Sequence, residues 1–346
     1  MFHTNPCVEC GIPMVIHDTG YILIKGNSVS TLFDQMNIEY EVKQDKVIYY
    51  YSSRDVLKTL MDNLFHHVDN MSHFQASIHQ SKDSLKYNLI PLLHLYERIV
   101  NERIVTFIQK GEFISYIQPI IDLNKHHQLY GYESLLRSAD PSENIYPSEI
   151  FSVAEKTGLK SMLDQRAREE AIKSRLNKIS PGVKSFINFL PSTIYNPEYC
   201  LRHTFAIVEK YNVNPSDLVF EVVETEKIDD VEHLKNILRT YKNSGMKVAL
   251  DDVGAGYSTI NMLTELKPDY VKIDREYISF CDQDSRKQAF LDQVISITKQ
   301  LGIIVLGEGI ERKEELDYCK HIGMDLAQGY YIGKPSPEAA NIPSMI

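Results

Sequence analysis

Polar side chains recur at the ends of short apolar runs between residues 113 and 331 of this 346-residue chain. Apolar runs of about four to eight residues, bounded by turn signals, are typical of buried strands. A polar group at the end of such a run is costly to bury alone, because it loses its hydration. In chain order these residues are Glu133, Asn188, Glu221, Asp251, Asp252, Lys272, Glu308 and Gln328.

Five carboxylates are in this set, and gathering them at one place requires compensating positive charge, because like charges repel. Carboxylates with an Asn carbonyl suit Mg²⁺ or Mn²⁺, whereas the lack of Cys and His disfavours zinc. The adjacent pair Asp251 and Asp252 would let one carboxylate bridge two ions, an arrangement typical of phosphodiester hydrolysis. Any one of these residues could instead be a helix cap, a surface charge or a structural amide. Their recurrence at strand after strand favours a shared site.

Alternating strands and helices are predicted to position these residues, which indicates an α/β fold with a mainly parallel sheet. About eight strands over about 230 residues favour a closed (β/α)₈ TIM-like barrel, in which strand C-termini meet on one face. The lack of a Gly-x-Gly-x-x-Gly turn after the first strand weakens a dinucleotide-binding sheet. The predicted strands are Phe113–Ile121, Tyr130–Leu136, Lys184–Phe189, Leu218–Val223, Lys247–Leu250, Tyr270–Ile273, Ile303–Leu306 and Leu326–Tyr331, and the predicted helices are Ala167–Ile179, Val231–Ser244, Arg286–Leu301 and Lys313–His321.

The N-terminal residues differ in pattern and predict a small α+β module before the barrel. Strands are predicted at Met14–Ile16, Tyr21–Ile24 and Lys46–Tyr51. A helix should follow Ser53 as its N-cap, and a second helical stretch, residues 83–109, should kink at Pro91. The predicted organisation is a sensory or regulatory module over residues 1–80, a helical connector over 81–111 and the barrel over 112–340. His66, His67, His73 and His79 share no helical face and are predicted to be solvated.

Charge and cysteine content narrow the setting and the partners. A net charge of −10 disfavours duplex nucleic acid as a partner. Five cysteines, no signal-peptide pattern and no apolar run long enough for a membrane span predict a cytoplasmic protein. Cys7 and Cys10 are half of a zinc motif, a redox pair or two ordinary thiols, and all three interpretations stay open.

Five short motifs, taken with Asn188, Glu221 and Lys272, resemble one family, the EAL-domain cyclic-di-GMP phosphodiesterases. The resemblance covers about Leu95 to Pro335, with Ser134 where the family name has Ala. It implies an irregular barrel with one antiparallel strand, two Mg²⁺ or Mn²⁺ ions, a homodimer formed through this domain, and hydrolysis of cyclic-di-GMP to linear pGpG. The motifs are Gln118-Pro-Ile, Glu133-Ser-Leu, Asp251-Asp-Val-Gly-Ala-Gly-Tyr-Ser, Gly307-Glu-Gly-Ile-Glu and Gln328-Gly-Tyr.

The resemblance also implies residue roles. The expected metal ligands are Glu133, Asn188, Glu221, Asp251, Asp252 and Glu308. The residues expected to serve catalysis are Lys272, which would hold the attacking water, Glu308 and Glu133. The residues expected to contact substrate are Gln118, Leu135, Arg137 and Gln328.

Two departures from the family pattern fall in the loop after Asp252, where Val253 replaces Phe and Ala255 replaces Thr. Glu224 matches the residue that anchors this loop. Because every metal-site position is retained, the sequence predicts an active phosphodiesterase that the N-terminal module regulates. The alternatives are a catalytically silent cyclic-di-GMP receptor and a scaffold for dimerisation, and the scaffold would leave the carboxylates unexplained.

Overall fold

The computed structural model describes residues 13–67, 73–82, 88–223, 230–254 and 260–339, which form two compact units. One unit comprises residues 1–112 and 140–163, and the other comprises 113–139 and 164–346. The predicted domain boundaries at residues 80 and 111 stay predictions. No helix in the described ranges combines the length and apolarity needed to cross a bilayer.

The first unit contains a five-stranded antiparallel sheet in the order β2-β3-β1-β4-β5. Its apolar core includes Ile22 and Ile24 of β1, packed with Leu57 and Leu60 of α2. Its strands are β1 (Gly20–Lys25), β2 (Glu41–Lys43), β3 (Lys46–Tyr51), β4 (Gln75–His79) and β5 (Ile90–Pro91), and its helices are α1 (Val29–Gln35), α2 (Arg54–His67), α3 (Leu92–Val100), α4 (Glu102–Lys110) and α5 (Pro147–Lys156). An α+β module is therefore confirmed.

Several local predictions for this unit hold and others are wrong. Ser53 caps α2, since its hydroxyl accepts a hydrogen bond from the Val56 amide at 3.2 Å. Residues 14–16 form no strand, and Pro91 precedes α3 instead of kinking a longer helix. His79 is buried on β4, where its Nε2 lies 2.8 Å from the Ser77 hydroxyl, so its predicted exposure is wrong. A strand pairing, not a helical surface, sets that position.

The second unit is a closed eight-stranded barrel in the order β10-β11-β12-β13-β6-β7-β8-β9. All pairs are parallel except those of β6, which runs antiparallel to both β7 and β13. The TIM-like barrel prediction is confirmed, including its one reversed strand. The strands are β6 (Phe113–Asp122), β7 (Gln128–Ser138), β8 (Lys184–Phe189), β9 (Leu218–Val222), β10 (Lys247–Val253), β11 (Tyr270–Ile273), β12 (Ile304–Gly307) and β13 (Leu326–Gln328).

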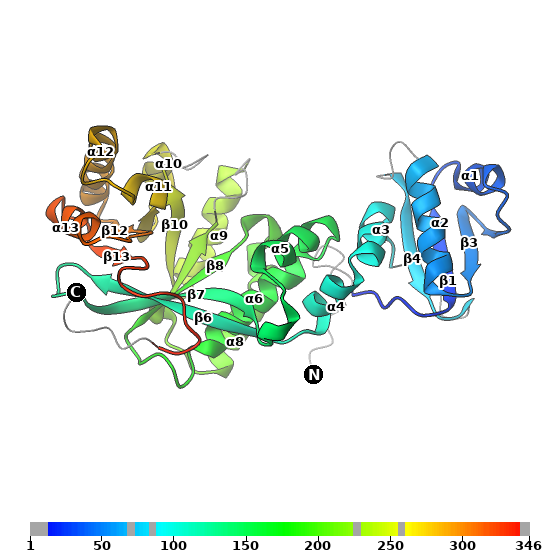
Figure 1. Cartoon of the computed structure of the whole chain (residues 1–346), viewed down its shortest axis with the longest axis horizontal. Helices are drawn as coiled ribbons and strands as arrows, with labels where there is room; N and C mark the ends of the chain where they lie inside the picture. Colours follow the sequence, from blue (N-terminus) through cyan, green and yellow to red (C-terminus); the bar gives the residue numbers. More distant parts are fainter. Residues whose placement is uncertain (1–12, 68–72, 83–87, 224–229, 255–259, 340–346) are drawn as a thin grey trace. The chain divides into compact units, whose positions relative to one another are not determined.

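Helices surround these strands (Figure 1), and their apolar faces form the larger core with the outward side chains of the strands. Inside the barrel lies a separate apolar layer that includes Phe186, Val219, Tyr270 and Leu306. This layer closes the barrel below the site, as in other barrels of this size. The helices are α6 (Lys160–Ser174), α7 (Pro197–Cys200), α8 (Arg202–Lys210), α9 (Val231–Asn243), α10 (Ile260–Leu266), α11 (Arg275–Ile278), α12 (Ser285–Leu301) and α13 (Lys313–His321).

Candidate active site

A polar layer stands directly above the apolar layer inside the barrel. Side chains on a strand alternate between faces, so residues two positions apart point the same way. Asn188 therefore follows Phe186 on the inner face of β8, and Lys272 follows Tyr270 on β11. The strands bring together all eight strand-end residues singled out from the sequence and add Gln118 of β6, whose register partner is Glu133.

Lys272 is the centre of this layer and is only 1% exposed. Its ammonium lies 2.6 Å from Glu308, 2.9 Å from Glu221, 3.1 Å from Asp251 and 3.6 Å from Glu133. One cation thus faces four carboxylates that come from four different strands or strand ends. Buried charges are tolerated only when they are paired and hydrogen-bonded, and here the negative charge exceeds the positive charge.

Amide side chains complete the ring on the β6–β7 side. Asn188 donates a hydrogen bond from Nδ2 to Glu133 at 3.1 Å, and Gln328 donates from Nε2 to the other Glu133 oxygen at 2.7 Å. The Gln328 Nε2 also lies 3.0 Å from Oε1 of Gln118, whose own amide donates to the Gly333 carbonyl. Both oxygens of Glu133 are therefore oriented by neighbouring amides.

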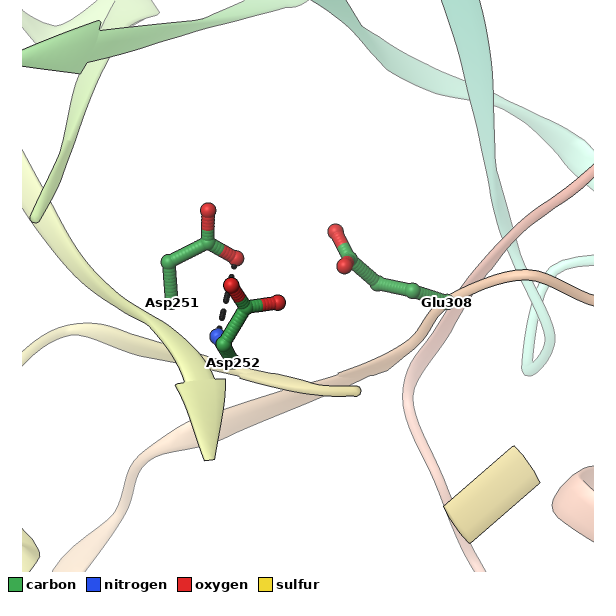
Figure 2. Close-up of side chains that lie close together, drawn as sticks. All are labelled: Asp251, Asp252 and Glu308. Carbon is green, nitrogen blue, oxygen red and sulfur yellow. Dashed lines mark hydrogen bonds between the residues drawn. The ribbon is translucent and has the colours of Figure 1, made fainter. Parts of the chain in front are cut away.

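Figure 2 shows a second grouping of carboxylates at the mouth of the barrel. Asp251 and Asp252 lie near the end of β10, and Glu308 reaches toward them from the segment after β12. One oxygen of each lies within 4.8 Å of the others. The Asp252 amide donates to Oδ1 of Asp251 at 3.0 Å. Asp252 has a φ of 50°, the left-handed region that Asp tolerates better than most residues. This irregularity in β10, where the register with β11 shifts between Leu250 and Val253, places two consecutive carboxylates beside the same opening.

Burial and charge shift the protonation equilibria of these groups. Burial raises the pKa of Glu221 and Glu308 well above the ordinary range, although Lys272 opposes the shift. Burial also raises the pKa of Asp251. Burial alone would lower the pKa of Lys272, but the surrounding carboxylates outweigh it and raise that pKa well above the lysine range. Buried carboxyl groups and a lysine that shift one another's pKa values within one cleft are typical of functional sites.

The donor set fits divalent cations that prefer oxygen ligands. Among the side chains of this polar layer, three buried oxygens have no hydrogen-bond partner in the described residues: Oδ1 of Asn188, Oε1 of Glu221 and Oε1 of Gln328. An unsatisfied buried acceptor costs about 1–3 kcal/mol, so such groups usually have a ligand or water partner. Oxygen atoms and excess negative charge together suit Mg²⁺ or Mn²⁺.

A cavity of about 230 Å³ opens above these residues. Gln118, Glu133, Glu308 and Gln328 line it, and four further lining residues belong to the motifs around Glu308 and Gln328: Gly309, Glu311, Gly329 and Tyr330. The sequence analysis did not select the other two lining residues, Asp274 and Arg275. Asp274 and Arg275 directly follow β11, and Glu311 lies three residues after Glu308. A search limited to strand ends could not select Asp274 and Arg275, but their position just past the end of β11 was a usable signal.

Leu135 and Arg137 are not among the residues that line this cavity. They follow Glu133 by two and four positions on β7, so all three share the inner face of that strand. Arg137 lies over the Tyr116 ring, with 5.6 Å between its guanidinium carbon and the ring centroid, and donates to the Leu136 carbonyl at 2.8 Å. Its guanidinium is thus held beside the site without a carboxylate contact in the described residues.

Some predicted residues lie outside the described ranges: Glu224, Ala255, Cys7 and Cys10. Val253 is described and is fully buried at the end of β10. Gly254 follows it with a φ of 114°, and a Cβ there would lie 2.6 Å from the Tyr277 ring. A glycine is therefore required where the loop leaves the site.

Comparison with known families matches residues 101–335 to the EAL domain. The chain belongs to the EAL domain family, that of the cyclic-di-GMP phosphodiesterases. Its EAL domain is 32% identical to PdeG of Escherichia coli K12, a probable cyclic di-GMP phosphodiesterase, over 66% of the chain and 45% of PdeG. It is 28% identical to the cyclic di-GMP phosphodiesterase RocR of Pseudomonas aeruginosa, over 68% of the chain and 60% of RocR. The chain thus spans about half the length of these relatives.

A solved structure shares the architecture of the EAL domain. The crystal structure of a standalone EAL protein from Vibrio cholerae O395, in its c-di-GMP-bound form, is 31% identical with a TM-score of 0.61. The match covers 68% of this chain and 98% of the Vibrio protein. The match therefore takes in nearly all of the Vibrio protein and leaves about a third of this chain unmatched.

Proposed function

We propose that this protein hydrolyses cyclic-di-GMP to linear pGpG with two Mg²⁺ or Mn²⁺ ions. The observation that carries the proposal is the convergence of five carboxylates and Asn188 on one barrel mouth, with unpartnered oxygens among them. The related Vibrio protein, of which a c-di-GMP-bound structure is known, supports the choice of nucleotide. In the reaction a water molecule adds across one phosphodiester bond and opens the ring.

The carboxylates and Asn188 divide between two metal positions in this proposal. Glu133, Asn188, Glu221 and Asp251 would hold one ion, and Asp251 would bridge to a second ion that Asp252 also binds, with Glu308 beside it. When bound, such ions lower the pKa of a coordinated water to about 7, which makes hydroxide available near neutral pH.

The remaining side chains have roles in orientation and charge stabilisation. Lys272 lies between Glu308 and Glu221, where its ammonium can donate a hydrogen bond to the attacking water or to a phosphoryl oxygen as charge develops there. Gln328 orients Glu133 and, with Gln118, Leu135 and Arg137, would contact the nucleotide. The guanidinium of Arg137 suits a phosphate oxygen pair.

Assembly and control form the wider part of the proposal. The EAL domain would form a homodimer in the cytoplasm, and the N-terminal module would regulate it. Sedimentation of the full chain would test the dimer, and removal of residues 1–80 would test the control of turnover. Cys7 and Cys10 remain a candidate zinc pair that metal analysis of the full chain would test.

The deciding experiment incubates the purified full chain with cyclic-di-GMP and Mg²⁺ or Mn²⁺ and follows pGpG by chromatography. Formation of pGpG that stops when EDTA is added supports the proposal. Binding of cyclic-di-GMP without turnover would instead identify the alternative, a silent receptor. If the protein neither binds nor hydrolyses cyclic-di-GMP, both functions are refuted.

A further inference from the structure

A buried ion pair lies outside the candidate active site, on α6 of the barrel unit. Asp164 and Arg168 are one helical turn apart, their side chains are 3% and 4% exposed, and Arg168 Nη2 lies 2.9 Å from Asp164 Oδ2. Replacing such a pair with apolar residues is often neutral or stabilising, because desolvation offsets the attraction. Stability alone is therefore a weak reason for two charges here, and their contacts show what else they hold.

Asp164 holds the turn that follows β8. Its Oδ1 accepts a hydrogen bond from the Leu190 amide at 3.0 Å, and its Oδ2 accepts one from the Thr193 hydroxyl at 2.9 Å. These two donors bracket a short 3₁₀ turn, Pro191–Thr193. Leu190 is only two residues after Asn188, so the carboxylate fixes the backbone just beyond an active-site side chain.

Arg168 fixes the position of that carboxylate in turn. Its Nη1 donates to the Thr204 hydroxyl on α8 at 2.9 Å and lies 3.4 Å from the Tyr241 hydroxyl on α9. Both partners are themselves buried. The pair therefore connects the end of β8 to α6, α8 and α9 through oriented hydrogen bonds. Apolar packing is not directional and would not by itself hold the turn in a single orientation.

Asn188 needs this precision, because its two ends act differently. Its Nδ2 donates to Glu133, while its Oδ1 is buried without a partner among the described residues. We propose that Asp164, held by Arg168, is a positioning residue that aims Oδ1 of Asn188 at a divalent cation. This inference rests on the metal site of the proposed function. Groups that orient metal ligands typically contribute about 10- to 100-fold in metal affinity or activity.

A second buried pair provides a matched control at the other end of the same strand. Arg175 Nη2 lies 2.8 Å from Asp217 Oδ2, and their side chains are 6% and 4% exposed. Asp217 also accepts from the Gly182 amide at 2.9 Å, just before β8 begins at Lys184. The two pairs are alike in chemistry and burial, but only the Asp164–Arg168 pair adjoins Asn188.

The experiment compares two double variants of the full chain, Asp164→Ala/Arg168→Met and Asp217→Ala/Arg175→Met. Neither variant leaves a charge from its own pair behind; in the second, the 22% exposed Lys184 loses its 3.7 Å contact with Asp217 but still donates to the Ser216 carbonyl. Mn²⁺ binding is measured without nucleotide, from the electron paramagnetic resonance signal of free Mn²⁺, and thermal unfolding is recorded in EDTA. We expect the Kd for Mn²⁺ to rise about tenfold in the first variant and to change less than about twofold in the second, at similar loss of thermal stability.

A Kd for Mn²⁺ that is unchanged from the wild type in the first variant would overturn the positioning role, as would a Kd that rises equally in both double variants. If the first variant does not fold, Asp164→Asn replaces it, because this change keeps the shape of the side chain and one acceptor oxygen. A Kd for Mn²⁺ equal to that of the wild type in Asp164→Asn would then overturn the positioning role. A wild type that binds Mn²⁺ but does not hydrolyse cyclic-di-GMP would refute only the proposed reaction. A wild type that binds no Mn²⁺ would refute both.

Discussion

Replacing Lys272 with methionine should destabilise the metal-free protein in a strongly pH-dependent way. The ammonium contacts Glu308, Glu221 and Asp251 at 2.6–3.1 Å and is almost fully buried. At an effective dielectric constant of about 20, two opposite unit charges about 3 Å apart attract by roughly 5 kcal/mol. The loss of hydration on burial cancels much of this attraction. Breaking a buried pair from one side typically costs about 3–5 kcal/mol, which is the loss in free energy of unfolding expected at pH 8.

Two conditions should reduce this loss. Lowering the pH toward 6 should reduce it, because the carboxyl groups already have raised pKa values and take up protons in place of the ammonium. Adding Mn²⁺ at pH 8 should also reduce it, because divalent cations supply the missing charge. Turnover should nonetheless fall at least about 100-fold at saturating Mn²⁺, since a hydrogen-bond donor at the reacting phosphate is gone.

Urea titrations in EDTA at pH 8 and pH 6, repeated with Mn²⁺, measure these effects. Lys247→Met is the matched control, because Lys247 contacts Asp269, the residue just before the neighbouring strand β11, at 3.0 Å but is 45% exposed. An exposed pair of this kind contributes at most about 1 kcal/mol. A Lys272→Met loss no larger than that of Lys247→Met, or one that neither pH nor Mn²⁺ alters, would refute the role of Lys272 as the compensating cation.

Three further results are expected. Glu133→Gln should weaken Mn²⁺ binding and lower kcat/KM at least about 100-fold, and unchanged Mn²⁺ affinity in calorimetry would remove Glu133 from the ligand set. Metal-free wild type should gain thermal stability as the pH falls from 8 toward 6, because groups whose folded pKa is raised contribute stability that is lost as the pH rises through that pKa; a flat profile in scanning calorimetry would contradict these shifts. Arg137→Ala should raise KM about tenfold with little change in kcat. The reason is that a phosphate contact of equal strength in the bound substrate and in the transition state contributes to binding alone. Arg137→Lys should restore KM only in part, and an unchanged KM in Arg137→Ala would exclude the phosphate contact.

The barrel was predictable because its strands are short, buried and separated by amphipathic helices. Lys184–Phe189 and Tyr270–Ile273 were predicted with the bounds that the structure has. The reversal of β6 came from the family resemblance, although the sequence carried a signal. In the parallel strands a polar residue follows the inward apolar residue by two positions, as Asn188 follows Phe186. In β6 the order is reversed, since Gln118 precedes Ile120.

The candidate site was predictable as a set of residues but not as a network. Lys272 contacts four carboxylates at once. These contacts depend on the register of the barrel strands, which no local sequence pattern encodes. The Asp164–Arg168 pair was missed because it stands on a helix, away from the strand ends. Its signal was two opposite charges one turn apart on a helix face directed at the core. His79 was misassigned because a histidine count was considered without the strand that buries it.

The most direct test of the account is anomalous diffraction at the manganese edge from crystals of the full chain grown with Mn²⁺ and cyclic-di-GMP. The account predicts two peaks at the barrel mouth that share Asp251, one reaching Glu133, Asn188 and Glu221 and the other reaching Asp252. Diffraction that shows nucleotide bound in the barrel but no anomalous peak at these carboxylates would contradict it.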